Sequence, residues 1–351
     1  MMRNVERLQA RAASLGVALR PHLKTAKSID VARHTLQGYS RATVSTVKEA
    51  EMFAASGLQD IVYAVGISPD KLPRIQRLRE AEHNVKVLLD SVQQANACVA
   101  HGVPAFIEID SDGHRGGLRP DDATLVEIGK ILHAKGCLEG VLTHAGESYG
   151  ASEPEERAKF AEIERDAAVS AARHLTNAGI SCPTVSVGST PTAHAATNLD
   201  GVTELRAGVY MFFDLVMAGI NACKKDDIAL SVLTTVIGHQ PDRGWIICDA
   251  GWMALSRDRG TATQDIDQGY GLVCTLDGTL IPELMVKFAN QEHGTIAIRD
   301  GASAELPSLP IGTRLRILPN HACATAAQHD HYNVLFSDGK PMAKWPRFNG
   351  W

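Results

Sequence analysis

Eight short apolar runs, rich in β-branched residues, limit the folds open to the first 210 residues of the chain. In order they are "VALRP", "ATVST", "DIVYAV", "VKVLLD", "AFIEID", "LEGVLTHAG", "PTVSVGS" and "ELRAGVY". Amphipathic stretches of helical period separate them, such as "KLPRIQRLREAE", "DATLVEIGKILHAKG" and "SEPEERAKFAEIERDAAVSAARHLTNAG". Strands that alternate with helices in this number predict a (β/α)8 barrel of the TIM type.

The longest amphipathic stretch also carries signals for its two ends. Ser152 with Glu155 three residues later predicts a capping box at its start, and Gly179 predicts its end. A doubly wound open sheet is the alternative fold. It is disfavoured because no G-x-G-x-x-G motif follows the first strand.

From about residue 225 the rhythm changes. Strand-like runs joined by Asp, Gly and Pro turns follow without a long helix between them, among them "ALSVLTTVIGHQ", "GWIICDAG", "GYGLVCTL", "LMVKFANQEHGTIAI", "GTRLRILPN" and "HYNVLFSDG". We therefore predict a barrel over residues 1–222 and an antiparallel β-domain over residues 223–351.

Composition narrows the class of protein. Of the 351 residues, 44% are hydrophobic and 21% are charged, and the formal net charge is −5 with no arginine-rich tract, which argues against a nucleic-acid partner. No apolar run approaches the roughly 20 residues that cross a bilayer, and the start lacks a signal peptide's apolar segment. Seven scattered cysteines without a C-x-x-C pair favour a reducing cytoplasm.

A barrel places its chemistry at the carboxyl ends of its strands, and polar residues gather there in this sequence. Lys24 follows the first strand in "RPHLKT", with His22 and Thr25 beside it. A lysine at this place can form a Schiff base with an aldehyde cofactor, although a solvated loop lysine is the commoner case.

The seventh strand ends in "VGSTPT", where Gly188, Ser189 and Thr190 offer backbone N–H groups and hydroxyls to a phosphate. The eighth ends in "RAGVY", with Gly208 and Tyr210. The loops after strands seven and eight of such barrels frequently bind phosphate, so this interpretation is favoured over a plain Ser/Thr turn.

A Schiff-base lysine after strand one and a phosphate site after strands seven and eight is the layout of a pyridoxal phosphate enzyme on a barrel. Four further side chains at strand ends are candidates for the remaining cofactor contacts: Arg115, His144, Tyr149 and Arg206.

A second kind of signal lies in "ILPNHACAT". His321 and Cys323 stand two residues apart after a strand-like run, so both point to one side of an extended segment. Such a pair is more often structural or incidental than a metal site. Two ligands alone would leave coordination positions open, which suits a catalytic metal, and Glu292 and His293 in "NQEHG" are a possible source of further ligands.

Taken together, "RPHLKT", "DGHRGG", "THAGESY", "VSVGSTPT", "RAGVY", "NQEHG" and "LPNHACAT" resemble the fold-type III pyridoxal phosphate enzymes that act on D-3-hydroxy amino acids. This group has the alanine racemase-like fold and includes D-threonine aldolases and eukaryotic D-serine dehydratases. The resemblance covers essentially the whole chain.

The resemblance implies roles for the motif residues. Lys24 would be the Schiff-base lysine, and His321 and Cys323 the ligands of one divalent metal ion (Zn²⁺, Mn²⁺, Co²⁺ or Mg²⁺). Arg115 would face the phenolic oxygen of the cofactor, and Arg206 its pyridine nitrogen. The other implied cofactor contacts are His144, Tyr149, Gly188, Ser189, Thr190, Gly208, Val209 and Tyr210, and the implied substrate contacts are His22, Gln291, Glu292 and His293.

The expected activity is that of an ammonia-releasing dehydratase. The resemblance implies a D-3-hydroxy amino acid as substrate, with D-threo-3-hydroxyaspartate, which would give oxaloacetate, as the first choice. Cysteine at residue 323 resembles the dehydratases, since the aldolases more usually have aspartate there. D-serine dehydratase or D-threonine aldolase activity is the alternative, and an amino acid racemase, a non-catalytic cofactor carrier and a zinc-stabilised structural protein are less favoured.

Two further expectations follow from the resemblance. Related barrels complete their active sites from a partner's β-domain, so we expect a homodimer with shared sites. Relatives also begin with an additional segment that forms a strand of the β-domain, whereas this sequence starts within the first barrel helix. Either the sequence begins late or the protein does without that strand.

Overall fold

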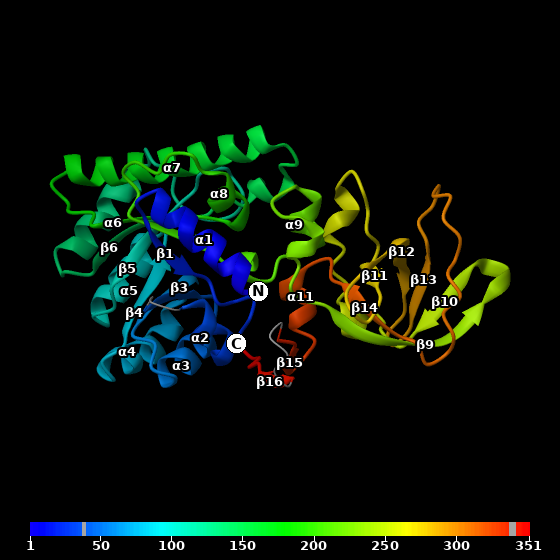
Figure 1. Cartoon of the computed structure of the whole chain (residues 1–351). Helices are drawn as coiled ribbons and strands as arrows, with labels where there is room; N and C mark the ends of the chain where they lie inside the picture. Colours follow the sequence, from blue (N-terminus) through cyan, green and yellow to red (C-terminus); the bar gives the residue numbers. More distant parts are fainter. Residues whose placement is uncertain (37–39, 337–341) are drawn as a thin grey trace. The chain divides into compact units, whose positions relative to one another are not determined.

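The computed structural model describes residues 1–36, 40–336 and 342–351. The chain divides into two compact units (Figure 1). One comprises residues 2–210 and 333–351, and the other comprises Met1 and residues 211–332. The prediction was 1–222 and 223–351; in the structure the second unit begins at residue 211, and the end of the chain from residue 333 belongs to the first unit.

The first unit is built on an eight-stranded parallel sheet. Its strands are β1 (Ala18–Pro21), β2 (Arg41–Val44), β3 (Asp60–Gly66), β4 (Asn84–Leu89), β5 (Ala105–Ile109), β6 (Leu138–Thr143), β7 (Thr184–Val187) and β8 (Glu204–Ala207). β8 pairs with β1, and a bridge between His22 and Thr43 joins the ends of β1 and β2, so the sheet curls into a barrel rather than an open sheet. The predicted (β/α)8 fold is confirmed.

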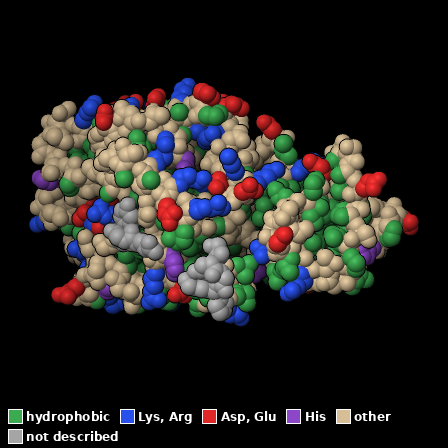
Figure 2. Space-filling view, viewed as in Figure 1, with side chains coloured by type: hydrophobic (Ala, Val, Ile, Leu, Met, Phe, Trp, Pro, Cys, Tyr) green, Lys and Arg blue, Asp and Glu red, His purple; other side chains and the backbone are tan. Residues whose placement is uncertain are grey.

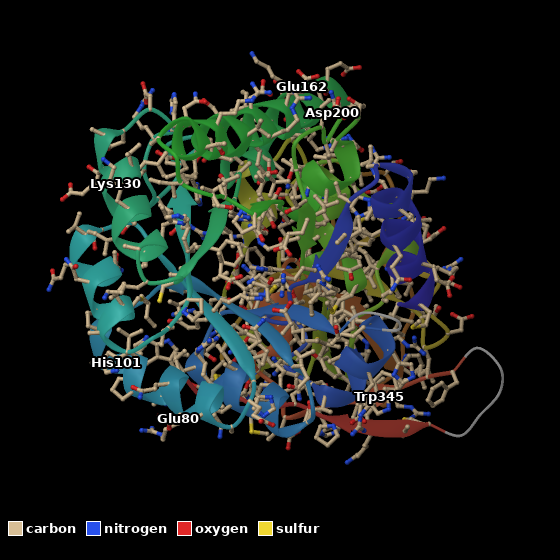
Figure 3. All side chains as sticks on the ribbon, turned by 90° about the vertical axis from the view of Figure 1, so that its left-hand side faces the viewer. Glu80, His101, Lys130, Glu162, Asp200 and Trp345 are labelled. Carbon is tan, nitrogen blue, oxygen red and sulfur yellow. The ribbon has the colours of Figure 1, made fainter. Side chains whose placement is uncertain are left out.

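Helices cover the outside of this sheet (Figure 1). They are α1 (Met2–Ser14), α2 (Ile29–Thr35), α3 (Val47–Ala55), α4 (Leu72–Glu80), α5 (Val92–Ala100), α6 (Ala123–His133), α7 (Pro154–Asn177) and α8 (Thr190–Ala195), with the 3₁₀ turns η1 (Pro69–Lys71), η2 (Glu147–Gly150) and η3 (Val209–Met211). Figure 3 shows Glu80, His101, Lys130, Glu162 and Asp200 around the outer rim.

Local sequence explains where these helices begin. The side chains of Thr46 and Ser91 accept the N–H groups of Glu49 and Gln94, which caps α3 and α5. The predicted capping box of Ser152 and Glu155 is wrong. Pro154 occupies the first turn of α7, so Glu153 is the N-cap and makes no side-chain cap, while the carbonyl of Ser152 accepts the Arg157 guanidinium at 2.7 Å.

Residues 333–351, at the end of the chain, belong to the first unit. β15 (His331–Val334) and β16 (Ala343–Pro346) form a two-stranded sheet. Trp345 of β16 (Figure 3) stacks on His34 of α2, and the Arg347 Nε donates to the Ala26 carbonyl at 2.9 Å. The run "HYNVLFSDG" was predicted as a strand of the β-domain. Its first four residues form β15, which straddles the boundary between the two units, and its residues 337–339 lie outside the described residues.

The second unit is a closed antiparallel barrel with the strand order β10-β13-β12-β11-β14-β9. Its strands are β9 (Val232–Gln240), β10 (Trp245–Cys248), β11 (Leu272–Cys274), β12 (Leu280–Ala289), β13 (Gly294–Ile298) and β14 (Arg314–Leu318). Short helices connect them: α9 (Leu215–Gly219), η4 (Lys225–Asp227), η5 (Pro241–Arg243), α10 (Trp252–Leu255), η6 (Gly260–Thr263) and α11 (Ala322–Ala326). The predicted antiparallel β-domain is thus confirmed in kind.

Alternation along the strands builds the core of this second barrel. In β9, Val232 and Val236 are buried while Leu233 and Ile237 are exposed, as expected of a strand with one face inward. Val236, Ile246, Val286, Ile296 and Ile317 meet in the interior. Figure 2 shows hydrophobic side chains on the outer surface of this unit as well. No helix in the described ranges is long and apolar enough to span a membrane.

Candidate functional site

Lys24 follows β1, next to a histidine whose protonation is set by its surroundings. The backbone N–H of Lys24 donates to His22 Nδ1 at 3.4 Å, and His22 Nε2 lies 3.3 Å from Ser45 Oγ. Burial, followed by the positive charges of Lys24 and Arg206, lowers the pKa of His22 well below 6.5. His22 is therefore neutral, with Nδ1 as an acceptor and its proton on Nε2 directed at Ser45.

Arg206 lies inside the barrel on β8. Its Nη1 donates to Ser186 Oγ at 2.7 Å and its Nη2 to the Thr143 carbonyl at 2.6 Å. Burial lowers the pKa of Arg206 to about 10, although Glu204 opposes this shift. Ser186 in turn donates to Glu204 at 2.6 Å, and Glu204 also binds Arg20. Arg206 is thus a fixed cation at neutral pH.

His144 and Tyr149 come from the loop after β6. Their ring centroids are 6.0 Å apart, and His144 Nδ1 lies 3.0 Å from the Gly188 carbonyl. Burial, followed by the charge of Lys24, lowers the pKa of His144 to about 3. The neutral ring must therefore donate from Nδ1 to that carbonyl, which leaves Nε2 as a hydrogen-bond acceptor.

The loop after β7 has the features of an anion site. Gly188 has φ +135°, and a Cβ there would lie 2.0 Å from the Arg206 carbonyl oxygen, so only glycine fits. Ser189 caps α8 in a reciprocal capping box with Thr192. Among the described residues, Thr190 Oγ1 is buried and has no hydrogen-bond partner, and an orphaned hydroxyl in this loop fits a phosphate oxygen as its acceptor.

The remaining predicted cofactor residues are spread over the same end of the barrel. Gly208 follows β8, and a Cβ there would lie 3.2 Å from the His22 carbonyl oxygen, so β8 and β1 end close together. Val209 and Tyr210 lie buried in η3. Arg115 is half exposed and lies 3.6 Å from Glu108, and burial raises the pKa of Glu108.

Glu164 is a residue of this unit that the sequence analysis missed. It is buried on α7, where its Oε1 accepts the N–H groups of Ala145 at 2.9 Å and Gly188 at 3.0 Å. It therefore ties the loop that carries His144 to the loop that carries Thr190. A glutamate among the many charged residues of α7 gives no sequence signal of such a role.

The predicted metal ligands lie in the β-barrel unit. His321 is the N-cap residue of α11, and Cys323 lies in its first turn. His321 Nδ1 lies 2.6 Å from Asp258 Oδ2. Burial lowers the pKa of His321, but the hydrogen bond with Asp258 and the neighbouring Cys323 outweigh this and raise it to about 11.

The backbone between the two ligands is also fixed. Asp214, buried at the start of α9, accepts the N–H of Ala322 at 2.8 Å. Asn320 accepts the Thr261 N–H at 3.0 Å and donates to the Gly269 carbonyl at 2.6 Å. One imidazole, one thiolate and a carboxylate on the far ring nitrogen form a donor set that fits a divalent metal ion at Nε2 and Sγ.

The "NQEHG" segment is a tight turn between β12 and β13. Gln291, Glu292 and His293 are exposed, and the Asn290 N–H donates to the His293 carbonyl at 2.8 Å. Within the described part of the chain, no three His, Cys, Asp or Glu side chains come together around a metal position. Glu292 and His293 lie in this exposed turn, and their part in a metal site stays a prediction.

Two family models match the chain. "Alanine racemase, N-terminal domain" matches residues 1–216, and "Putative serine dehydratase domain" matches residues 229–335. The first range corresponds to the parallel barrel, and the second to the antiparallel barrel and the predicted metal ligands.

Curated relatives match over nearly their whole length. A D-threo-3-hydroxyaspartate dehydratase of Delftia sp. is 54% identical, over 100% of this chain and 95% of the relative. A D-serine dehydratase of Dictyostelium discoideum is 29% identical over 97% and 94%, and a D-threonine aldolase of Arthrobacter sp. is 30% identical over 97% and 88%.

Solved structures agree with these matches. The structure of the Delftia dehydratase superposes with a TM-score of 0.96 at 53% identity, covering 100% of this chain and 95% of that one. A cysteine-to-alanine mutant of a D-threo-3-hydroxyaspartate dehydratase, in the metal-free form, superposes with a TM-score of 0.96 at 53% identity, covering 100% of this chain and 95% of that one.

Proposed function

This chain belongs to the alanine racemase-like family that includes D-threo-3-hydroxyaspartate dehydratase, and we propose that it is a dehydratase that releases ammonia from a D-3-hydroxy amino acid. The observation that carries the proposal is the 54% identity to that enzyme over the full length of this chain. The aldolase relative is 30% identical, which makes the cleavage of a carbon–carbon bond the second candidate.

Pyridoxal phosphate is the proposed organic cofactor. When bound, it supplies an aldehyde for a Schiff base and a ring that takes up electrons from the substrate. Lys24 would hold the aldehyde and later accept the proton from the substrate's α-carbon. The orphaned Thr190 hydroxyl supports a phosphate after β7, and the buried Arg206 cation supports a ring nitrogen that stays unprotonated.

Residues around Lys24 would control proton positions. His22 and His144 are both neutral because burial and the charge of Lys24 lower their pKa values. Neither ring competes with Lys24 as a second cation, and the free Nε2 of His144 is available as an acceptor. Arg115 is the proposed partner of the cofactor's phenolic oxygen.

A divalent metal ion is the second proposed cofactor, held by His321 and Cys323. When bound, it supplies a Lewis acid for the 3-hydroxyl, which is otherwise a poor leaving group. The imidazole and thiolate favour Zn²⁺ on softness, and Mn²⁺, Co²⁺ and Mg²⁺ are the alternatives. Asp258 would hold His321 with Nε2 free for the metal, and Asp214 would hold the backbone between the two ligands.

The proposed substrate is D-threo-3-hydroxyaspartate, with oxaloacetate and ammonia as products. Loss of water from the substrate leaves an enamine, and its hydrolysis returns the water and releases the ammonia. An aldolase acting on the same substrate would give glycine and glyoxylate instead. Product analysis by chromatography separates these reactions, and glycine as the main product would contradict the proposal.

The oligomeric state and the cellular location are proposed from the same family. We expect a homodimer with shared active sites, in the cytoplasm, with no nucleic-acid or membrane partner. Sedimentation of the purified protein tests the dimer, and a monomer with full activity would contradict shared sites.

A further inference from the structure

A continuous row of hydroxyl groups joins the loop after β6 to the 188–192 segment, which leads from β7 into α8. Ser148 Oγ donates to the Ala145 carbonyl at 2.7 Å and lies 2.9 Å from Ser189 Oγ. Ser189 Oγ lies 2.9 Å from Thr192 Oγ1, which lies 2.7 Å from Glu164 Oε2. All four side chains are at most 2% exposed, so water does not complete these contacts.

The number of hydrogens available along this row differs between an ionised and a protonated Glu164. The row has four contacts: Glu164 to Thr192, Thr192 to Ser189, Ser189 to Ser148, and Ser148 to the Ala145 carbonyl. The three hydroxyl groups supply three hydrogens for these four contacts. The backbone N–H groups of Ser189 and Thr192 donate separately, to Thr192 Oγ1 at 3.0 Å and to Ser189 Oγ at 3.2 Å. An ionised Glu164 supplies none and leaves one buried contact between two oxygens without a hydrogen.

A protonated Glu164 supplies the missing hydrogen. Every donor then points the same way, from Glu164 Oε2 through Thr192, Ser189 and Ser148 to the Ala145 carbonyl. The other carboxyl oxygen, Oε1, remains an acceptor for the Ala145 and Gly188 N–H groups, so no polar atom of the row is left over.

The electrostatic surroundings agree with a neutral group. Burial raises the pKa of Glu164, and the hydrogen bonds and the charge of Arg206 on β8 only partly oppose this shift. The loops after β6 and β7 present hydroxyl and backbone N–H groups to it, and the neighbouring His144 is neutral. Arg206 is therefore the cation that acts on it, and that guanidinium donates to Ser186 and Thr143 instead.

We propose that Glu164 is an uncharged positioning residue: its carboxyl proton sets the direction of the hydrogen-bond chain along the 188–192 segment and fixes that segment for a phosphate dianion. This proposal rests on the proposed pyridoxal phosphate. An uncharged Glu164 explains how a carboxyl group can lie against the Gly188 N–H without repelling the phosphate. It also assigns the Ser189 hydroxyl to the chain, which leaves Thr190 as the hydroxyl that faces the ligand.

The pH dependence of stability tests the protonation state without substrate. A glutamate whose pKa is raised on folding holds a proton that the unfolded chain loses above about pH 4.5. The wild type must therefore lose stability relative to Glu164→Gln as the pH rises from 5 to 8, because the amide copies the neutral carboxyl at every pH. Glu162→Gln, an exposed position on the same helix (Figure 3), is the matched control and should show no such trend.

Thermal unfolding of the apoproteins gives the readout. A wild-type melting temperature that rises or stays level relative to that of Glu164→Gln over this range would overturn the proposal, as would failure of Glu164→Gln to fold. Titration with pyridoxal phosphate tests the positioning: Glu164→Gln should retain the wild-type dissociation constant, and Glu164→Ala should weaken it about tenfold or more. Equal losses in both variants would contradict the role. Neither readout uses dehydratase activity, so failure of the proposed reaction would be seen separately.

Discussion

His321 and Asp258 are joined through the imidazole Nδ1 at 2.6 Å, although 63 residues separate them in the chain. This contact fixes the ring so that Nε2 is the nitrogen left for a metal ion. We predict that Asp258→Asn weakens the binding of Zn²⁺ about 10- to 100-fold, because the amide no longer orients the ring or raises its basicity. Isothermal titration of the apoprotein with the metal measures the change.

The control for this prediction is Asp300→Asn, which removes an exposed carboxylate that pairs with Lys287. It should leave metal affinity unchanged. Wild-type affinity in Asp258→Asn would show that the contact does not serve a metal site.

Lys24→Ala should abolish the visible absorbance of the lysine-bound cofactor, because no other amine is proposed to hold the aldehyde. Lys130→Ala, at an exposed position of α6, is the control and should keep the full spectrum. If the colour of Lys24→Ala survives gel filtration at wild-type intensity, the assignment of the Schiff base is wrong.

Thr190→Val tests the phosphate contact. The valine keeps the shape of threonine and removes a buried hydroxyl that has no partner among the described residues, so the apoprotein should be at least as stable as the wild type. Its affinity for pyridoxal phosphate should fall about tenfold or more, since the lost hydrogen bond would be to a charged group.

Thr192→Val gives the contrast. The Thr192 hydroxyl lies 2.7 Å from Glu164 and accepts the Ser189 N–H at 3.0 Å. Thr192→Val should therefore lower the melting temperature of the apoprotein, whereas Thr190→Val should not. An unchanged affinity of Thr190→Val for pyridoxal phosphate would show that the Thr190 hydroxyl does not bind the phosphate.

His144 should make the apoprotein sensitive to acid. Burial and Lys24 lower its pKa to about 3, whereas the unfolded chain takes up this proton near pH 6.5. The stability that the neutral ring contributes is thus complete above pH 6.5 and is lost as the pH falls toward 3. Relative to His144→Gln, which can still donate to the Gly188 carbonyl, the wild type should lose melting temperature from pH 7 to 5. A constant difference would contradict a neutral, buried His144.

The sequence predicted those parts of the molecule that have a local period. Each of the eight strand runs became a strand of the parallel barrel, because runs rich in β-branched residues alternate with stretches of helical period. Lys24, His144, Arg206 and the 188–190 turn were predicted as site residues because a barrel brings the ends of its strands to one face, and their roles stay a prediction.

What the sequence could not predict depends on contacts between distant residues. Glu164 looks like one more charged residue of α7, and only the folded structure shows its carboxyl group between two loops. Asp258 lies in a loop of charged residues without a pattern. The end of the chain was assigned to the wrong unit because the stacking of Trp345 on His34 leaves no trace in local periodicity.

The central claim is that this protein releases ammonia from D-threo-3-hydroxyaspartate with both cofactors in place. The most direct measurement follows ammonia and oxaloacetate from a panel of D- and L-3-hydroxy amino acids, including D-serine and D-threonine, before and after chelation and after metal is restored. We predict equal amounts of ammonia and oxaloacetate from D-threo-3-hydroxyaspartate, lost on chelation and recovered with metal. Glycine as the main product, or full activity without metal, would contradict the account.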